Sequence, residues 1–417
     1  MAKPKLALIP SSQGSKLYSV LPSSGVGDFD FTRSGGATRI NSQGLIETVA
    51  SGVSRLNYPM IDGVVKGCPH HILEPQRLQK IQYSEDFSQS YWTKGGTTVL
   101  SNEIISPKGD LTADLITVNS GSSNGGLFRF GTWNTTLQTF SIFAKVGNHN
   151  IIDIGQMSNE WVAVFDIELG IITSVNGNLT SADIINYGNG WYRCSVTHAQ
   201  SSGAATLGVR VLGENNSAYL YGAMLEQGSY ATSYIPNYGT AAGVTRSAET
   251  ANGSGDAATF NDSEGVLMAD ISEGYSDNQH KLITINDGTN NKVIVIGYDN
   301  VVNRVYGEYY NVSSQGRVIF DLTDATIYTK IALKYDQTNI YFYVNGFLIN
   351  QASISSVFNN GDLTQLSFSN GSGSQPFYGN TKQIQYYDSA LNDSDLEKLT
   401  SWVSFTDMAE GQLYSIE

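Results

Sequence analysis

The chain has 417 residues and a formal net charge of −14, with 40% hydrophobic and 15% charged residues. This length allows two or three domains, each with its own core. No stretch approaches the roughly 20 apolar residues that a membrane helix needs, and an acidic chain repels phosphate. We therefore expect neither membrane insertion nor a nucleic-acid partner. The content of Gly (43) and Tyr (24), with only 9 Pro, predicts an all-β chain of short strands and turns.

The charge is distributed unevenly along the chain. Residues 1–80 carry nine Lys or Arg against five Asp or Glu, a net of +4, and the remainder carries fifteen against thirty-three, a net of −18. The only two cysteines, Cys68 and Cys194, cannot form a disulfide framework and are expected to be reduced thiols. The N-terminal apolar run stops at Pro10, which is too short for a signal-peptide core. Assembly in a cytoplasm is the expectation.

Residues 1–80 form a leading arm with neither helical periodicity nor long strands. Such a segment buries too little apolar surface to offset its own ordering entropy, so we expect it to order against another protein. The alternative is an extension wrapped over the chain's own first domain. The candidate docking residues of the arm are the aromatic and arginine residues Tyr18, Phe29, Phe31, Arg33, Arg39, Arg55 and Tyr58.

Residues 81–250 alternate between apolar and polar positions, for example over 139–145, 161–167 and 217–225. Gly, Asn and Ser separate these runs, so the segment is expected to form a β-sandwich. Residues 251–262 are small and polar, which is typical of a flexible linker.

Residues 263–417 are expected to form a second β-sandwich. Asn345-Gly346 lies between alternating residues, so the strands 341–344 and 347–351 are expected to pair through a hairpin turn. One helix is expected over 392–403, with Asn392 as its N-cap and Asp393 and Asp395 in its first turn.

No residue pattern favours catalysis. Asp166 and Glu168 in FDIELG would share a strand face, but they run into Gly170 and are better explained as turn residues. His70 and His71 follow Cys68 closely, yet adjacent residues of an extended chain point in opposite directions. We therefore predict no catalytic residues and no metal at the histidine pair, and we leave other metal sites open.

Three parts of the chain resemble known families. KLYSVLP (residues 16–22) and residues 27–47, GDFDFTRSGGATRINSQGLIE, resemble the N-terminal region of structural proteins of tailed bacteriophages. YSEDFS, NGWYR and GAMLEQGSYATSYIP are similar to a phage module related to carbohydrate-binding jelly rolls. YGNTKQIQYYDSALNDSDLEKL resembles the end of concanavalin A/laminin G-like domains. These resemblances imply a virion-attachment arm (1–80), a carbohydrate-binding-like sandwich (81–250), the linker, and a concanavalin A/laminin G-like sandwich (263–417).

The resemblances also imply a function. We expect a bacteriophage head or tail fibre subunit, made in the cytoplasm of the bacterial host and located in the virion. Its expected partners are other virion proteins, through residues 1–80, further copies of itself in a trimer, and a host-surface glycan. One alternative is a secreted bacterial carbohydrate-binding protein or an accessory module of a glycan-degrading enzyme. Another is an architectural decoration protein without a ligand. Neither a fibre subunit nor a decoration protein is expected to be an enzyme.

Sugars are bound by aromatic faces that stack on the ring and by polar groups that satisfy the hydroxyls. The candidate sugar-binding residues chosen on this basis are Trp133, Trp161 and Tyr187 in the first sandwich and Tyr306, Tyr309, Tyr310 and Asn311 in the second. The tyrosines of the second set are expected in a loop or at a sheet edge. No cofactor is expected, although the laminin G-like resemblance allows calcium, with Asp270, Asp299 and Asp321 as available ligands.

Overall fold

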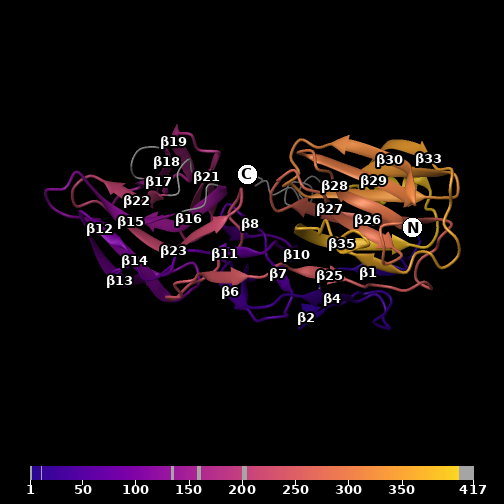
Figure 1. Ribbon diagram of the computed structural model, residues 1–417, viewed down its shortest axis with the longest axis horizontal. Helices are drawn as coiled ribbons and strands as arrows, with labels where there is room; N and C mark the ends of the chain where they lie inside the picture. Colours follow the sequence, from indigo (N-terminus) through magenta and orange to yellow (C-terminus); the bar gives the residue numbers. More distant parts are fainter. Residues whose placement is uncertain (1, 11, 133–135, 157–160, 200–203, 403–417) are drawn as a thin grey trace.

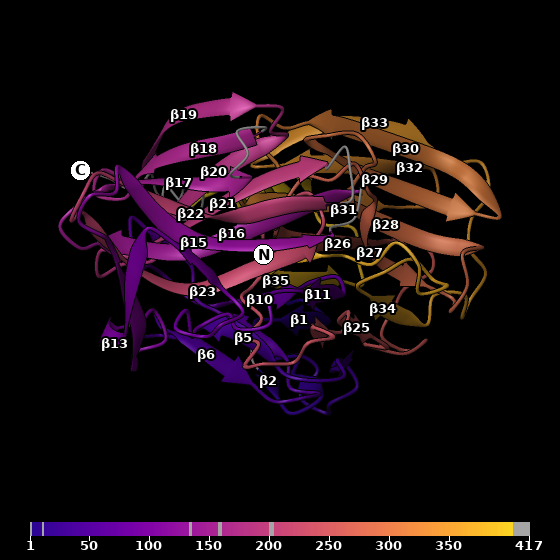
Figure 2. The same ribbon diagram turned by 60° about the vertical axis from the view of Figure 1, so that its left-hand side comes forward.

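The chain forms two β-sandwiches that lie side by side, with the N-terminal strands running beneath both of them (Figures 1 and 2). The computed structural model describes residues 2–10, 12–132, 136–156, 161–199 and 204–402. Strands dominate, and the predicted all-β sandwich class is confirmed. Within the described residues, no helix has the length and apolarity needed to span a membrane.

Two six-stranded sheets form the N-terminal sandwich. The first has the order β12-β15-β22-β17-β18-β19 and the second β13-β14-β23-β16-β21-β20. The strands of the first sheet are β12 (Thr93–Gly95), β15 (Asn124–Thr132), β22 (Ala204–Leu212), β17 (Ile151–Gln156), β18 (Trp161–Asp166) and β19 (Ile171–Gly177). Those of the second are β13 (Thr97–Ile105), β14 (Leu111–Val118), β23 (Ser217–Gln227), β16 (Leu137–Val146), β21 (Tyr192–Ala199) and β20 (Ser181–Asn186).

An eight-stranded and a five-stranded sheet form the C-terminal sandwich. The larger sheet has the order β33-β32-β31-β26-β35-β10-β7, with β1 also paired to β35. Its strands are β33 (Phe347–Ser353), β32 (Asn339–Val344), β31 (Thr329–Tyr335), β26 (Gly265–Glu273), β35 (Gly379–Tyr387), β10 (His70–Leu73), β7 (Arg55–Asn57) and β1 (Leu6–Leu8). The smaller sheet contains β30 (Ser313–Asp321), β29 (Arg304–Asn311), β28 (Lys292–Tyr298), β27 (Lys281–Asn286) and β34 (Gln365–Ser367), in that order.

Small sheets connect these bodies. They are β2 (Ser12–Gln13), β3 (Lys16–Leu17), β4 (Phe29–Thr32) and β25 (Thr250–Asn252) in one sheet, and the pairs β5 (Ala37–Ile40) with β6 (Ile46–Val49), β8 (Met60–Ile61) with β9 (Val64–Val65), and β11 (Arg77–Gln79) with β24 (Val244–Arg246). The helix of the described residues is α1 (Asp393–Thr400).

The hairpin turn and the helix cap predicted for the C-terminal sandwich are confirmed, although the helix already ends at Thr400. Val344 pairs with Phe347 across the turn, and both turn residues have the left-handed backbone that Asn-Gly supplies, with φ of 47° at Asn345 and 90° at Gly346. The Asn392 side chain accepts a hydrogen bond of 2.9 Å from the amide of Asp395, so it caps α1 as expected.

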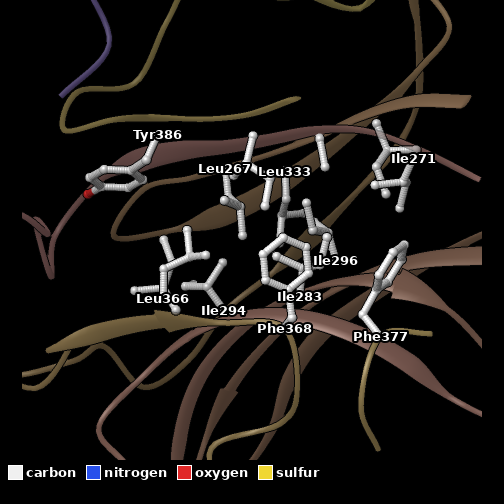
Figure 3. Close-up of a cluster of buried hydrophobic side chains, with 14 of the residues drawn as sticks. Leu267, Ile271, Ile283, Ile294, Ile296, Leu333, Leu366, Phe368, Phe377 and Tyr386 are labelled. Atoms are coloured by element: carbon white, nitrogen blue, oxygen red, sulfur yellow. The ribbon is translucent and has the colours of Figure 1, made fainter. Parts of the chain in front are cut away.

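The core of the C-terminal sandwich lies between its two sheets. Because alternate residues of a strand point to opposite faces, every second side chain enters this layer. Leu267, Ile271, Leu333 and Tyr386 come from the eight-stranded sheet, and Ile283, Ile294, Ile296 and Leu366 face them from the five-stranded sheet (Figure 3). On the outer side of the larger sheet, Leu396 of α1 packs against Val266, Met268 and Tyr387.

The arm differs from its prediction, because it belongs to the C-terminal sandwich. Strand β1 pairs with β35 along 6–8, and β10 pairs with another part of the same strand. Leu6, Leu8, Phe29 and Phe31 are 0–1% exposed and lie in the C-terminal core. The arm therefore orders against its own chain. Its strands β1 and β4 join the C-terminal core, and Ile46 packs on the N-terminal sandwich, so the alternative of wrapping over the first domain holds for that part of the arm.

The predicted linker is also part of the packed structure. Strand β25 pairs with β4, Ala251 and Ser254 are fully buried, and Phe260 packs edge-on against Tyr386 at 5.1 Å. A segment of small polar residues has this structure because the arm strand β4 supplies it with a partner. It is not the flexible spacer that composition alone predicts.

A buried cluster of charges joins the arm to both sandwiches. The Glu249 carboxylate accepts from Arg33 Nη1 at 2.7 Å, from Arg55 Nε at 2.8 Å and from the Glu74 amide at 2.9 Å. The Glu74 carboxylate is 2.8 Å from both Arg55 and Arg246. Burial alone would raise the pKa of Glu74, but Arg246 and Arg55 outweigh it and hold this pKa well below its usual range. We call these five residues the arginine cluster.

Glu249→Gln is expected to destabilise the protein by about 3–5 kcal/mol, because it leaves the buried Arg33 guanidinium without a carboxylate and Arg55 with Glu74 alone. The matched control is Asp30→Asn, which removes the exposed ion pair of Asp30 with Lys16 and should cost at most about 1 kcal/mol. Urea denaturation of the full chain measures both changes. Equal midpoints for the two variants would contradict a structural role for the cluster.

Candidate functional site

The two sheets of the N-terminal sandwich have different outer surroundings. Ile46 of the arm packs with Phe143, Trp191 and Tyr234, so the arm covers the outer side of the sheet that contains β16 and β23. On the outer side of the other sheet, Phe130 is 65% exposed. This second surface, formed by β15, β22, β17 and β18, is the candidate site, and we call it the β17 face.

Strand alternation places one ion pair at the centre of the β17 face. Ile152 and Ile154 point into the sandwich core, so Asp153 between them points outward. Register pairs Asp153 with Arg210 on β22, where Val209 and Val211 point inward in the same way. The Arg210 Nη2 lies 2.7 Å from the Asp153 Oδ2, and the side chains are 21% and 6% exposed.

A pocket of about 250 Å³ opens beside this pair, lined by Asp153, Val162, Val164, Asn176 and Arg210. Each charged group uses only part of its hydrogen-bonding capacity. The Oδ1 of Asp153 and the Nε of Arg210 are buried, and neither has a hydrogen-bond partner among the described residues. Buried polar atoms are normally paired, so an acceptor and a donor remain available for a ligand.

Two phenylalanines extend the β17 face along β15. Phe128 is half-buried beside Gly126 and Gly208, and Phe130 follows on the same face two residues later. A Cβ at Gly126 would lie 2.3 Å from the Val209 carbonyl oxygen, and one at Gly208 would lie 2.1 Å from the Leu127 oxygen. Both glycines are therefore required by close backbone contact, and they leave room for the Phe128 ring to lie across the sheet.

This arrangement suits a ligand that carries several hydroxyl groups. The Asp153 carboxylate accepts hydrogen bonds, the Arg210 guanidinium donates them, and the Asn176 amide does both. Val162 and Val164 provide an apolar floor, and the phenylalanine rings provide apolar faces at one end. A shallow surface with an apolar floor and a few polar groups is a common form of small-molecule site. Nothing in the geometry supplies a nucleophile beside a base.

The sugar-binding residues predicted in the first sandwich lie in three different places. Trp133 lies outside the described residues. The backbone of Trp161 begins β18, at one end of the β17 face, where it pairs with Gln156 and Gly177. Tyr187 belongs to the opposite side of the sandwich, where its ring meets Phe143 edge-on at 4.9 Å.

The sugar-binding residues predicted in the second sandwich lie on an inner strand, not in a loop or at a sheet edge. They lie on β29, which pairs with β28 on one side and with β30 on the other. Tyr309 is 1% exposed and stacks on Phe358 at 4.2 Å, and Tyr306 is 3% exposed beneath the Arg317 guanidinium at 4.0 Å. Neither ring has a face free for a sugar, which corrects the prediction for both.

Tyr310 and Asn311, the other two predicted residues of β29, are half-buried. Tyr310 packs beside Leu282, Val293 and Tyr306 on the outer side of the five-stranded sheet. The Asn311 amide donates to Ser356 Oγ at 3.0 Å and to the Val357 carbonyl at 2.9 Å. Its role in the structure is to hold the following loop.

The predicted docking residues divide by exposure. Phe29, Phe31, Arg33 and Arg55 are at most 3% exposed, because they pack in the core or in the arginine cluster, so they are unavailable to another protein in this structure. The other three are more accessible: Tyr18 is 39% exposed, and Arg39 and Tyr58 are half-buried.

The predicted turn role of Asp166 is confirmed, because its Oδ1 accepts from the amides of Glu168 at 2.9 Å and Leu169 at 3.0 Å. In the described part of the chain, no group of three His, Cys, Asp or Glu side chains lies close enough to hold a metal ion. Of the available calcium ligands, Asp299 pairs with Arg317 at 2.9 Å and Asp321 with Arg304 at 2.6 Å.

Sequence reasoning missed the residues of the β17 face because it searched for tryptophan and tyrosine. A signal was present in IIDIGQ and LGVRVL, where one charged residue stands alone between aliphatic residues. In an alternating strand, such a residue must leave the core.

No family model and no curated protein matches this chain. Among solved structures, a carbohydrate-binding module of a Ruminococcus gnavus sialidase bound to α2,3-sialyllactose matches 34% of this chain and 84% of its own, at 16% identity and a TM-score of 0.30. A domain of an extracellular Geobacillus stearothermophilus arabinanase in complex with arabinotriose matches 37% and 73%, at 12% identity and a TM-score of 0.28. A Bacteroides ovatus protein named as a carbohydrate-binding candidate matches 78% and 84%, at 11% identity and a TM-score of 0.27. These are similarities at low identity and low TM-score, and we draw no functional argument from them.

The buried histidines predict a pH dependence of stability. Burial lowers the pKa of His70 and of His71 to about 3, whereas an unfolded histidine titrates near 6.5. Between these values the unfolded chain binds protons that the folded chain does not, so stability is complete above about pH 6.5 and falls as the pH is lowered toward 3. His71→Phe should reduce this slope by up to about 1.4 kcal/mol per pH unit. Urea midpoints measured from about pH 4 to 7 test this, and an unchanged slope would contradict it.

Proposed function

We propose that this protein binds a glycan through the β17 face and that it does so as a structural subunit of a bacteriophage particle. The observation that carries the first part is the pair of buried, unpartnered polar atoms, Asp153 Oδ1 and Arg210 Nε, beside an open pocket with an apolar floor. Sugar hydroxyls donate to a carboxylate and accept from a guanidinium, so a single pyranose satisfies both groups.

The virion role rests on the sequence resemblance of residues 16–22 and 27–47 and of the first sandwich to phage structural proteins. The acidic body suits a particle component that remains soluble at high local concentration. Docking to the particle would use the accessible part of the arm, around Tyr18, because its buried residues hold the two sandwiches together. In a trimer, weak contacts at each β17 face would add through multivalency.

The alternative is an accessory carbohydrate-binding module of a glycan-degrading enzyme. The β17 face would serve that role equally well, because binding requires no virion. The phage assignment rests on the resemblances of the arm and of the first sandwich and not on the β17 face, so the two parts of the proposal need separate experiments. A decoration protein without a ligand would leave the unpartnered atoms of the β17 face unexplained.

Asp153→Asn is expected to weaken glycan binding by about ten- to a hundredfold, because the neutral amide replaces a charged acceptor of the same shape. A glycan array with the full chain identifies the ligand, and titration with the strongest hit measures the affinity. Glu168→Gln is the matched control, since it makes the same change at an exposed turn and should bind like the original chain. An array without hits, or equal affinity of both variants, would contradict the proposed site.

Immunogold labelling of purified phage particles with an antibody to the C-terminal sandwich tests the virion role. We expect regularly spaced label on the head or on the tail, with the position deciding between a head fibre and a receptor-binding fibre. Finding the protein only in the soluble fraction, with particles unlabelled, would contradict a structural role and leave glycan binding intact.

A further inference from the structure

A second pocket, of about 240 Å³, lies where the arm meets both sandwiches, and we call it the junction pocket. The arm contributes Asn57 and His70, the N-terminal sandwich contributes Tyr187 and Arg193, and the C-terminal sandwich contributes Tyr328 and Tyr378. The junction pocket and the β17 face lie on opposite sides of the N-terminal sandwich, because Tyr187 and Arg193 belong to the side that the arm covers.

The hydrogen bonds of Asn57 fix the proton of His70. The Asn57 Oδ1 accepts from the Ile40 amide at 2.7 Å, so its Nδ2 is the donor toward the His70 Nε2 at 3.1 Å. An Nε2 that accepts leaves the proton of the neutral ring on Nδ1. That Nδ1 is buried and has no partner within the described ranges, and the His70 side chain is 4% exposed and lines the junction pocket.

Arg193 provides a second donor on a charged side chain. Its Nη1 donates to the Thr232 carbonyl at 2.7 Å and its Nη2 to Ser141 Oγ at 3.0 Å, whereas its Nε has no partner in the part of the chain that the structure describes. The residue is 4% exposed, and no ion pair joins it to a carboxylate within the described residues. The charges of Asp183 and Glu226 lie close enough to interact with the Arg193 guanidinium but form no ion pair with it. A bound anion that accepts from the Nε would therefore add a charge-assisted hydrogen bond.

The other charged groups around the pocket are already balanced. Arg39 pairs with Glu47 at 3.0 Å, and the Glu74 carboxylate is held by Arg55 and Arg246. Within the described residues, the free capacity of the pocket therefore consists of two N–H donors, one of them on a guanidinium, and the Tyr328 hydroxyl. We propose that the junction pocket binds a small carboxylate ligand, whose oxygens accept from the His70 Nδ1–H and the Arg193 Nε–H. This inference does not depend on the proposed glycan site.

Thermal unfolding of the full chain with three probes tests the proposal at matched ionic strength. Acetate supplies the carboxylate alone, glucuronate supplies it on a sugar ring, and glucose is the neutral control. We expect one or both carboxylates to raise the Tm by about 2 °C or more above the value in glucose, which reports any binding of a neutral pyranose at the β17 face. A rise in Tm with both acetate and glucuronate assigns the site to simple carboxylates. A rise with glucuronate alone assigns it to sugar acids. No shift with either would overturn the proposal.

Two variants locate the effect in the junction pocket. His70→Phe removes the Nδ1 donor and should weaken binding about tenfold or more. His71→Phe is the matched control, because the adjacent ring packs between Phe31 and Phe368 in the core and should leave binding unchanged. Ala231→Phe fills the pocket without removing a hydrogen-bonding group, and it provides the test if His70→Phe fails to fold. Undiminished binding by a folded Ala231→Phe would overturn the assignment.

Discussion

The structure depends on the burial of Arg33, Arg55 and Arg246 around the Glu74 and Glu249 carboxylates. Charges taken out of water are tolerated only when every partner is in place, so the segments that supply them must assemble together. Two of these arginines come from the arm, and Arg246 and Glu249 come from the segment between the sandwiches. The cluster therefore couples the position of the arm to the connection between the two bodies.

This coupling determines which surfaces are available for function. The arm completes the eight-stranded sheet on one side and covers the outer side of the β16 sheet on the other. On the N-terminal sandwich, the β17 face then remains available for ligand binding. On this face an ion pair lies between two apolar regions. The same arrangement creates the junction pocket, since its walls exist only when the arm and both sandwiches are together.

Local features of the fold were predictable from the sequence, because neighbouring residues determine them. The turn at Asn345-Gly346 and the cap at Asn392 are of this kind. The arm was not predictable, because its partner β35 lies more than 300 residues away and short strands carry no signal of their pairing. Tyr309 was misplaced because alternation shows that two faces exist without showing which one is buried. Asp153 was identifiable in principle, as a lone charge in an aliphatic strand.

Hydrogen exchange of the isolated full chain tests most directly whether the arm is an internal part of this fold. We predict that the amides of β1 and β4 are protected nearly as strongly as those of β26 and β35, because they share one sheet or one core. Exchange of residues 6–8 and 29–32 at the rate of an unfolded chain, while the two sandwiches remain protected, would contradict it. The arm would then be a free segment that awaits another protein.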